Sequence, residues 1–531
     1  MLPPSRQSLQ HALSKKLLHS SAIVSGMTLI SRLVGFVRDM IIAVTFGATG
    51  TTDAFFVAFR IPNLLRRMFA EGAFAQAFVP VFTEYREQRS GTALRDLTDH
   101  VAGALLLLLT LITTVGVIAA PLLIWLFAPG FGADPEKQQL ATTMLRITFP
   151  YALFISLTAL AGGILNSFGR FAVPAFTPVF LNLCLIAAAL WLAPLLDEPV
   201  TALAWGVFIA GIVQLAFQVP ALMKIGLLPR PRWRRAHEGV RRIGRLMLPA
   251  LFGSSVAQLN MLLNTIIASF LVSGSISWLY FSDRFVELPL ALFGIALSTV
   301  ILPKLSAEHA SDDPDAFSHT LDWGLRLGLI IAIPAMLGLM LLATPIIATL
   351  LQYQAFTPFE TRMVAMALAV YAVGLPGFVL VKILAPGFYA RQDTTTPVKT
   401  GLIAIGVNIA LYGLLVVPWI LLDGPAPHAA LAFCTAMASF VNAGLLFRKL
   451  RQLGIYRPVT GWASLAVRVA IACLVMALLL STITPDADHW ASWSIATRAT
   501  VLAGLIGCAV IAYLGSLWLM GIRPRALLSS H

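Results

Sequence analysis

Residues 101–127, VAGALLLLLTLITTVGVIAAPLLIWLF, contain no charged side chain over a length that exceeds the ~20 apolar residues of a membrane-spanning helix. Similar apolar stretches recur along the whole chain of 531 residues, of which 58% are hydrophobic and 11% charged. Soluble globular domains are usually less apolar than this and more than twice as rich in charge. The sequence therefore excludes a water-soluble globule and predicts an all-α polytopic membrane protein.

Apolar windows bounded by proline, glycine or charge clusters predict about fourteen membrane spans. We place them at residues 22–47, 54–83, 98–127, 140–166, 171–195, 200–222, 246–272, 277–303, 320–350, 360–386, 397–421, 428–448, 463–483 and 496–520. Lys and Arg concentrate in alternate connections, most densely at residues 224–245. The positive-inside rule then predicts that both termini are cytoplasmic, and it explains the net charge of +13 better than nucleic-acid binding does.

The two halves of the chain repeat at an offset of 223 residues, at which Pro80 falls on Pro303 and Pro174 on Pro397. Six predicted spans separate equivalent positions, so the halves share one orientation and form a parallel repeat. A chance coincidence of prolines at helix ends is the alternative. The expected organisation is a cytoplasmic N-terminal segment at 1–21, an N-lobe of six spans at 22–222, a basic cytoplasmic linker at 223–245, a C-lobe of six spans at 246–448, and two extra C-terminal spans with a cytoplasmic end at 449–531.

Several spans carry charged residues near mid-depth, where each costs about 2.5–3.5 kcal/mol on the insertion scale. They are Arg32, Arg38 and Asp39 in span 22–47; Arg60, Arg66, Arg67 and Glu71 in span 54–83; Asp283, Arg284 and Glu287 in span 277–303; and Lys382 in span 360–386. Helical geometry places each set on one face, so we expect the residues to line a polar cleft between the lobes. The excess of guanidinium groups favours an anionic ligand that carries phosphate.

The alternative for these charges is a set of internal salt bridges that lock the lobes together. Arg60 and Lys382 could also snorkel or pair locally. None of the nine histidines lies mid-span, and the sequence holds no H-E-x-x-H, P-loop or G-x-S-x-G motif. The four cysteines lie far apart in apolar runs, without metal or disulfide spacing. The sequence predicts a transporter rather than an enzyme, with no metal and no cofactor.

Three long motifs carry a family resemblance. They are MTLISRLVGFVRDMIIAVTFGATGTTDAFFVAFRIPNLLRRMFAEGAFAQAFVPVFTEY (27–85), SGSISWLYFSDRFVELP (273–289) and LVKILAPGFYARQDTTTPVK (380–399). With these motifs the sequence resembles the MurJ (MviN) family, the bacterial lipid II flippases of the multidrug/oligosaccharidyl-lipid/polysaccharide (MOP) exporter superfamily. The resemblance implies that undecaprenyl-pyrophosphate-linked peptidoglycan precursor moves from the cytoplasmic to the periplasmic leaflet of the inner membrane, for cell wall synthesis.

The resemblance also implies site residues. Those expected to bind the substrate pyrophosphate and to orient the arginines are Arg32, Arg38, Asp39, Arg66, Arg67, Glu71, Asp283, Arg284 and Glu287. Asp53 is expected to act as a gate or a helix cap, with Arg60 and Lys382 in support. The expected mechanism is alternating access without covalent chemistry, driven by the membrane potential or by a coupling ion such as Na⁺ or H⁺ near Asp393.

The expected partners are lipid II and membrane lipids, for a monomer with the cell wall synthesis machinery as a candidate associate and without nucleic acid. A flippase for another polyprenyl-linked glycan is the main rival hypothesis, because it would use the same arginine chemistry. A drug or cation exporter is disfavoured by the excess of arginine. A membrane scaffold that transports nothing would not need charges at mid-depth.

Overall fold

A computed structural model describes residues 6–67, 74–233 and 237–522, with side chains described from residue 24 onward except at 249–257, 259, 295 and 296. Contacts within the chain divide it into two compact units, Met1–Phe270 and Leu271–His531. The described residues form helices and short connections and include no strand. The predicted all-α class is therefore confirmed.

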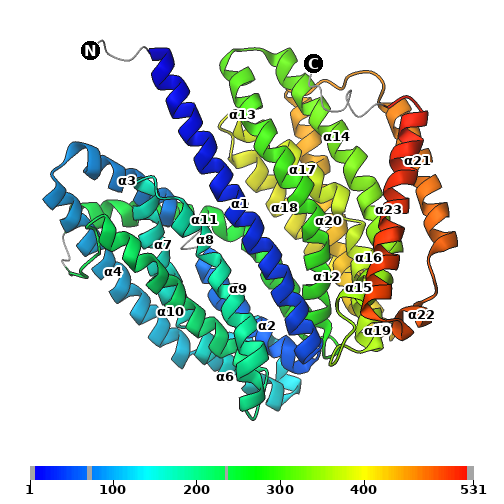
Figure 1. Cartoon of the computed structure of the whole chain (residues 1–531), viewed down its shortest axis with the longest axis horizontal. Coiled ribbons are helices and arrows are strands. Elements are labelled where there is room, and N and C mark those ends of the chain that lie inside the picture. Colours follow the sequence, from blue (N-terminus) through cyan, green and yellow to red (C-terminus); the bar gives the residue numbers. More distant parts are fainter. Residues whose placement is uncertain (1–5, 68–73, 234–236, 523–531) are drawn as a thin grey trace. The chain divides into compact units, whose positions relative to one another are not determined.

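The first unit runs from α1 to α11, coloured blue to green in Figure 1. Its helices are α1 (Arg6–Phe46), α2 (Gly50–Arg66), α3 (Phe74–Gln88), α4 (Gly91–Ile118), α5 (Ala120–Phe127), α6 (Pro135–Thr148), α7 (Tyr151–Ser167), α8 (Ala172–Phe176), α9 (Pro178–Ala187), α10 (Thr201–Lys224) and α11 (Glu238–Ser269). The long α1 packs along α8 and α9 (Figure 1). The contact with α9 is the one that positions the charges of α1.

Local chemistry sets the ends of these helices. α1 ends because Gly47 adopts a left-handed φ of 69°, which only glycine takes without strain, and its N–H donates to the carbonyl of Ala43 at 2.8 Å. α6 begins after Asp134, whose carboxylate accepts a hydrogen bond from the N–H of Lys137 at 3.1 Å. The cap of α6 thereby fixes the turn from which Lys137 extends.

The core of the first unit is aromatic. Phe74, Phe78 and Phe82 follow one face of α3, with successive ring centroids 5.1 Å apart. They pack against buried Leu97 of α4 and Ile164 of α7. This cluster fixes α3, α4 and α7 to one another within the unit.

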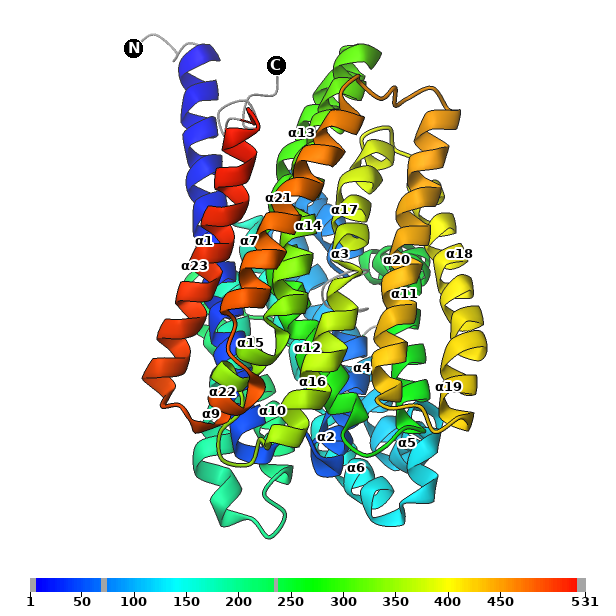
Figure 2. The same ribbon diagram turned by 90° about the vertical axis from the view of Figure 1, so that its right-hand side faces the viewer.

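The second unit begins after Phe270. Its helices are α12 (Ser275–Pro289), α13 (Ala296–Ala310), α14 (Pro314–Leu341), α15 (Ala343–Leu350), α16 (Pro358–Ala372), α17 (Leu375–Tyr389), α18 (Thr395–Leu411), α19 (Val417–Leu421), α20 (Pro427–Gln452), α21 (Trp462–Ile483), α22 (Ala487–Ser492) and α23 (Ile495–Leu519). Figure 2 shows α21 and α23 side by side in orange and red, where Cys473 and Met476 pack with Leu505 and Tyr513 in one apolar cluster. The two C-terminal helices thus form a packed pair.

Within the described residues, ten helical stretches are long and apolar enough to cross a membrane, some of them formed by consecutive helices such as α6 with α7 or α12 with α13. The pair α16 and α17, bent by 43°, makes an eleventh if it is one span. These correspond to every predicted span except 22–47, 54–83 and 246–272. Spans 22–47 and 54–83 carry most of the mid-depth charges, which lowers their hydropathy. Span 246–272 runs through residues whose side chains are not described. The chain is a multi-pass helical membrane protein, while the total of fourteen spans stays a prediction.

The exposed surface supports this conclusion. α4 leaves Leu107, Leu111, Val115 and Ile118 between 53% and 72% exposed. A row of exposed aliphatic side chains on one helix face is costly in water but fits the hydrocarbon region of a bilayer. α4 is therefore expected to face lipid on this side.

The boundary between the units differs from the expected lobe boundary. Residues 246–272, assigned to the C-lobe by the repeat, lie mostly in α11, and α11 packs on α3 and α4 of the first unit. A repeat describes ancestry within the sequence, whereas the units describe contacts in one conformation. The lobe boundaries remain a prediction.

Candidate functional site

The α1 charges form a buried network within the first unit. Arg38 donates from Nε to Asp39 Oδ1 at 3.0 Å and from Nη2 to the same oxygen at 2.5 Å. Its Nη1 donates to Asn182 Oδ1 of α9 at 2.9 Å, and Asn182 Nδ2 donates to the carbonyl of Ser31 at 3.0 Å. Gly35 lies next to this amide, and a Cβ there would make an ordinary van der Waals contact with Asn182 Nδ2 at 3.4 Å. Arg38 and Asp39 are brought together here, and both are buried.

Arg32 has a different environment on the same helix. The predicted polar stripe of α1 is exposed at Ser25, Thr28 and Arg32, and it becomes buried at Asp39. Within the described residues, no hydrogen bond or ion pair of the Arg32 guanidinium is observed. An arginine that is exposed on a membrane-spanning helix retains all of its donors for a ligand.

Two arginines of α2, Arg60 and Arg66, form hydrogen bonds with neighbouring side chains. Nη1 of Arg60 donates to the hydroxyl of Thr265 on α11. Nε of Arg66 donates to Asn63 Oδ1 at 2.8 Å, and Arg67, half-buried, lies at the C-terminal end of α2. Arg66 and Arg67 thus place two guanidinium groups at the C-terminal end of α2.

Glu71, which the sequence suggests as a partner for Arg67, lies outside the described residues. The pairing of these two side chains stays a prediction.

Asp53 is engaged at the start of α2. It is 1% exposed, and Oδ2 lies 3.1 Å from Lys137 Nζ of α6. The Lys137 side chain is itself buried, with Nζ 4.4 Å from the centroid of the Phe131 ring. Asp53 also places its negative charge in the first turn of α2, where the helix dipole favours it. This geometry supports an anchoring role for Asp53 between α2 and α6.

The second unit carries its charges on α12. Arg284 donates from Nη1 to Glu287 Oε2 at 2.6 Å and from Nη2 to the Tyr280 hydroxyl at 3.2 Å. Asp283 accepts a hydrogen bond from Tyr371 of α16. The Arg284 and Glu287 side chains are 31% and 49% exposed, so solvent or a ligand can reach this pair. On α12 the structure thus pairs Arg284 with Glu287, whereas Asp283 contacts Tyr371 of α16.

Lys382 and Asp393 lie further along the second unit. Lys382 of α17 is exposed, and no hydrogen bond or ion pair of its ammonium group is observed within the described residues. Asp393 accepts hydrogen bonds from the hydroxyl of Thr396 at 2.6 Å and from its N–H at 2.9 Å. These donors lower the pKa of Asp393 below its usual value. In this structure the carboxylate of Asp393 therefore caps the start of α18.

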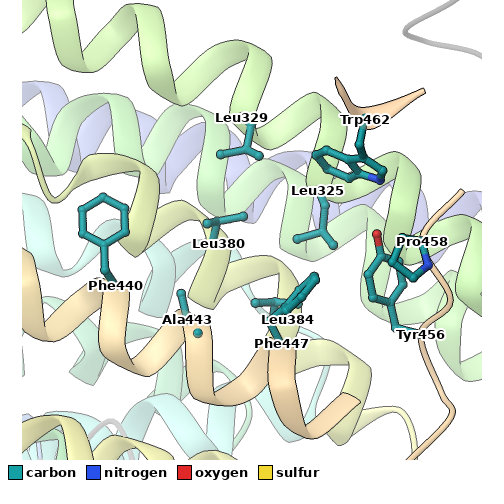
Figure 3. A pocket seen from close by; sticks show the side chains of 11 residues that line it. Leu325, Leu329, Leu380, Leu384, Phe440, Ala443, Phe447, Tyr456, Pro458 and Trp462 are labelled. Carbon is teal, nitrogen blue, oxygen red and sulfur yellow. The ribbon is translucent and has the colours of Figure 1, made fainter. Parts of the chain in front are cut away.

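An apolar cavity of about 460 Å³ lies within the second unit. Figure 3 shows side chains from α14, α17, α20 and the segment before α21 converging on it. The lining includes Leu325, Leu329, Leu380, Phe440, Tyr456 and Trp462. A cavity of this size and character suits hydrocarbon better than a charged group.

Several partners in these networks were absent from the sequence-based set, and three of them show why. Asn182 is an amide inside the otherwise apolar span 171–195, and that isolation was a usable signal. Lys137 sits in a short acidic connection, and nothing in its neighbourhood in sequence marks it as buried. Tyr371 belongs to a span with many other apolar residues, so its contact with Asp283 needed the tertiary structure.

Comparison with known proteins identifies the family. A sequence model of the family described as lipid II flippase MurJ matches residues 42–499. The chain belongs to the MurJ family. A relative from Vibrio cholerae, named as a probable lipid II flippase MurJ, is 47% identical over 97% of this chain and 98% of its own length. The resemblance seen in the three motifs is thereby confirmed.

Solved structures agree with this assignment. A lipid II flippase MurJ in an inward closed conformation is 26% identical, with a TM-score of 0.79 over 96% of this chain and 100% of that one. An inward-facing MATE family multidrug transporter of the MOP superfamily shares the fold alone, at 17% identity and a TM-score of 0.63 over 80% of this chain and 98% of that one. The fold and the family are those of transporters, as the sequence predicts.

Most of the candidate site residues lie within the range that the MurJ family model matches. Asp53, the three α2 arginines, the charged residues of α12 and Lys382 all lie within 42–499. Arg32, Arg38 and Asp39 precede residue 42, but the Vibrio cholerae relative extends over almost the whole chain.

Proposed function

We propose that the protein is a lipid II flippase, which moves undecaprenyl-pyrophosphate-linked peptidoglycan precursor from the cytoplasmic to the periplasmic leaflet of the bacterial inner membrane. The observation that carries this proposal is the family match over residues 42–499. The reaction makes and breaks no covalent bond, so it needs binding groups and a change of access rather than a nucleophile or a general base. The product would supply cell wall synthesis.

The exposed guanidinium of Arg32 is the leading candidate to bind the pyrophosphate. Arginine remains charged in a low-dielectric cavity and can donate two parallel hydrogen bonds to one phosphate. Arg66 and Arg67, side by side at the end of α2, provide the same chemistry. Glu71 stays a proposed orienting acid for Arg67.

Arg38 and Asp39 have a positioning role in this proposal. Asn182 and Asp39 already satisfy much of the Arg38 guanidinium, so direct binding would require these hydrogen bonds to break. By holding α1 against α9, the network fixes the direction in which Arg32 points.

The α12 cluster is the proposed second contact for the anionic group. A half-exposed pair such as Arg284 with Glu287 is worth only about 0–1 kcal/mol in water, so a phosphate can displace the carboxylate at small cost. Asp283 orients the cluster through Tyr371. Asp53, Arg60 and Lys382 are proposed to support the helices that carry these groups.

The proposed architecture has fourteen spans, both termini in the cytoplasm, and two six-helix lobes followed by two extra spans. Alternating access exposes the site to one leaflet and then to the other. The membrane potential or an ion such as Na⁺ or H⁺ is the proposed driving force, and the protein is proposed to act as a monomer. Membrane lipids surround it, and the cell wall synthesis machinery is a proposed associate.

Binding of lipid II to the full-length protein in detergent tests this proposal. Loss of a charge-assisted hydrogen bond pair costs about 1.5–3 kcal/mol, so Arg32→Ala should weaken binding about tenfold or more. Arg362→Ala removes an equally exposed arginine from α16 and serves as the control, with unchanged affinity. Undecaprenyl pyrophosphate without sugar should compete. The proposal would be contradicted if Arg32→Ala and Arg362→Ala bound lipid II with equal affinity. It would also be contradicted if only polyprenyl lipids that carry other glycans competed with lipid II.

A further inference from the structure

The segment that leads into α11 is docked tightly on α4. The N–H of Arg230 donates to Asp99 Oδ1 at 2.8 Å, and the N–H of Arg232 donates to the Asp99 carbonyl at 3.0 Å. A Cβ at Gly103 would lie only 2.0 Å from the Arg232 carbonyl oxygen, so only glycine allows this approach. Residues 230–232 are therefore held against the surface of α4.

Two histidines and one aspartate meet beside this contact. Asp96 and His100 lie one helical turn apart on α4, and His237 immediately precedes α11. His100 Nδ1 lies 3.3 Å from Asp96 Oδ1, and His237 Nε2 lies 3.3 Å from Asp96 Oδ2. One ligand atom from each residue can be chosen so that all three atoms lie within 4.8 Å of one another.

The contact between His237 Nε2 and Asp96 Oδ2 fits metal ligation as well as a long hydrogen bond. Nitrogen and oxygen ligands at about 2.0–2.2 Å from a tetrahedral ion lie roughly 3.3–3.6 Å apart, close to the observed 3.3 Å between these two atoms. The two imidazole rings stack with centroids 4.8 Å apart and planes 20° apart.

The burial pattern is that of an accessible site. The His100 and His237 side chains are 9% and 11% exposed, whereas the Asp96 side chain is 47% exposed. His237 Nδ1 is buried and forms no hydrogen bond with the described residues. His100 Nδ1 lies 2.8 Å from the Asp96 carbonyl oxygen, so this nitrogen donates its proton there and Nε2 is the His100 nitrogen left to bind an ion. Solvent can supply an ion and a water ligand from the Asp96 side.

Within the described residues, three neighbouring arginines pair with other acids: Arg232 with Asp99 at 3.8 Å, Arg89 with Glu238 at 3.6 Å and Arg242 with Glu84 at 2.8 Å. The hydrogen bond from Arg242 lowers the pKa of Glu84 below its usual value. Within the described residues, the Asp96 carboxylate contacts both histidines.

We propose that Asp96, His100 and His237 bind a divalent transition-metal ion of the Zn²⁺ class, with water completing the coordination. Because Asp96 and His237 are 141 residues apart in the sequence, the ion joins α4 to the start of α11. No short motif could reveal such a site. The inference does not depend on the proposed substrate.

Metal content of the purified full-length protein tests the site. After chelator treatment, equilibrium dialysis against Zn²⁺ should give one tightly bound ion per chain, and the ion should raise the thermal unfolding midpoint. His100→Ala and His237→Ala should each weaken binding at least tenfold. His319→Ala removes an exposed histidine of α14 and should leave binding unchanged. His237→Cys provides an alternative ligand and should retain the ion, which separates ligation from packing.

Three results would overturn the proposal. One is the absence of saturable Zn²⁺ binding by the wild-type protein. Another is binding that persists unchanged in both alanine variants when they elute as the wild type does. The last is an unfolding midpoint that shifts between pH 6 and pH 8 without metal while Zn²⁺ has no effect, since the cluster would then respond to protons alone.

Discussion

Lys137→Met is expected to destabilise the protein by about 3–5 kcal/mol, because it leaves the Asp53 carboxylate buried without its cation. At the observed separation of 3.1 Å, and with an effective dielectric constant of about 20, the attraction between the two charges is roughly 5 kcal/mol. Desolvation of both groups offsets much of this attraction in the intact pair. The full cost appears only when one charge remains alone.

A double-mutant cycle measures the coupling. The single variants are Asp53→Asn and Lys137→Met, the second of which keeps an apolar contact with Phe131. Unfolding in mixed micelles of a mild and a denaturing detergent gives the free energy of unfolding for each variant. The double variant should lose less unfolding free energy than the sum of the losses in the two single variants, which gives a coupling energy of about 2 kcal/mol or more.

Glu136→Gln is the matched control, because it removes an exposed charge from the same turn of α6 and should change stability by less than about 0.5 kcal/mol. A stability loss below about 1 kcal/mol for Lys137→Met, with coupling near zero, would refute the anchoring role. If Asp53→Asn instead left stability unchanged but altered transport, Asp53 would be a gate.

Further predictions concern three other contacts. Asn182→Ala should cost about 2–4 kcal/mol of unfolding free energy, because it removes two hydrogen bonds and leaves Arg38 Nη1 buried without that acceptor; an unchanged midpoint in a detergent thermal melt would contradict this. Asp322→Asn in α14 should lower the free energy of unfolding by about 2–3 kcal/mol, because it places an amide donor against the Arg326 guanidinium, whose Nε donates to Asp322 Oδ2 at 2.6 Å. Unfolding in detergent measures this loss, and a loss under about 1 kcal/mol would refute it. The hydrogen bonds from Thr396 lower the pKa of Asp393 below 3.8, so they stabilise the fold above that pH and their contribution is lost as the pH falls through the lower folded value. The midpoint difference between wild type and Asp393→Asn should therefore be constant above about pH 5 and shrink below it, and a difference that grows on acidification would show that the sign is wrong.

The sequence was sufficient for the class of fold and for the helices that carry charge. Long apolar windows leave few alternatives to spanning helices, and charges within them must contact protein, a cavity or a ligand. Arg284 and Glu287 are three residues apart, so their contact on α12 follows from helical geometry alone. The position of such a pair on one helix is therefore predictable.

Contacts between helices were less predictable. Arg38 and Arg32 lie six residues apart and look alike in sequence, yet one is buried against Asn182 and the other is exposed. The difference arises from the packing of α9 against α1, and no local pattern encodes it. The same limit applies to Asp53 and its partner on α6.

The accessibility of lipid II at the outer surface of the cytoplasmic membrane tests the central claim most directly. Bacteria whose only copy of this protein can be depleted are treated from outside with an enzyme that cleaves lipid II, and intact and cleaved precursor are quantified. The account predicts that depletion protects the precursor and that wild type and Arg362→Ala restore cleavage, whereas Arg32→Ala and Arg284→Ala do not. Arg32 is a cleaner probe than Arg38, whose loss would also disrupt a buried network. If the precursor remained fully cleavable after depletion, lipid II transport would not be the required task of this protein.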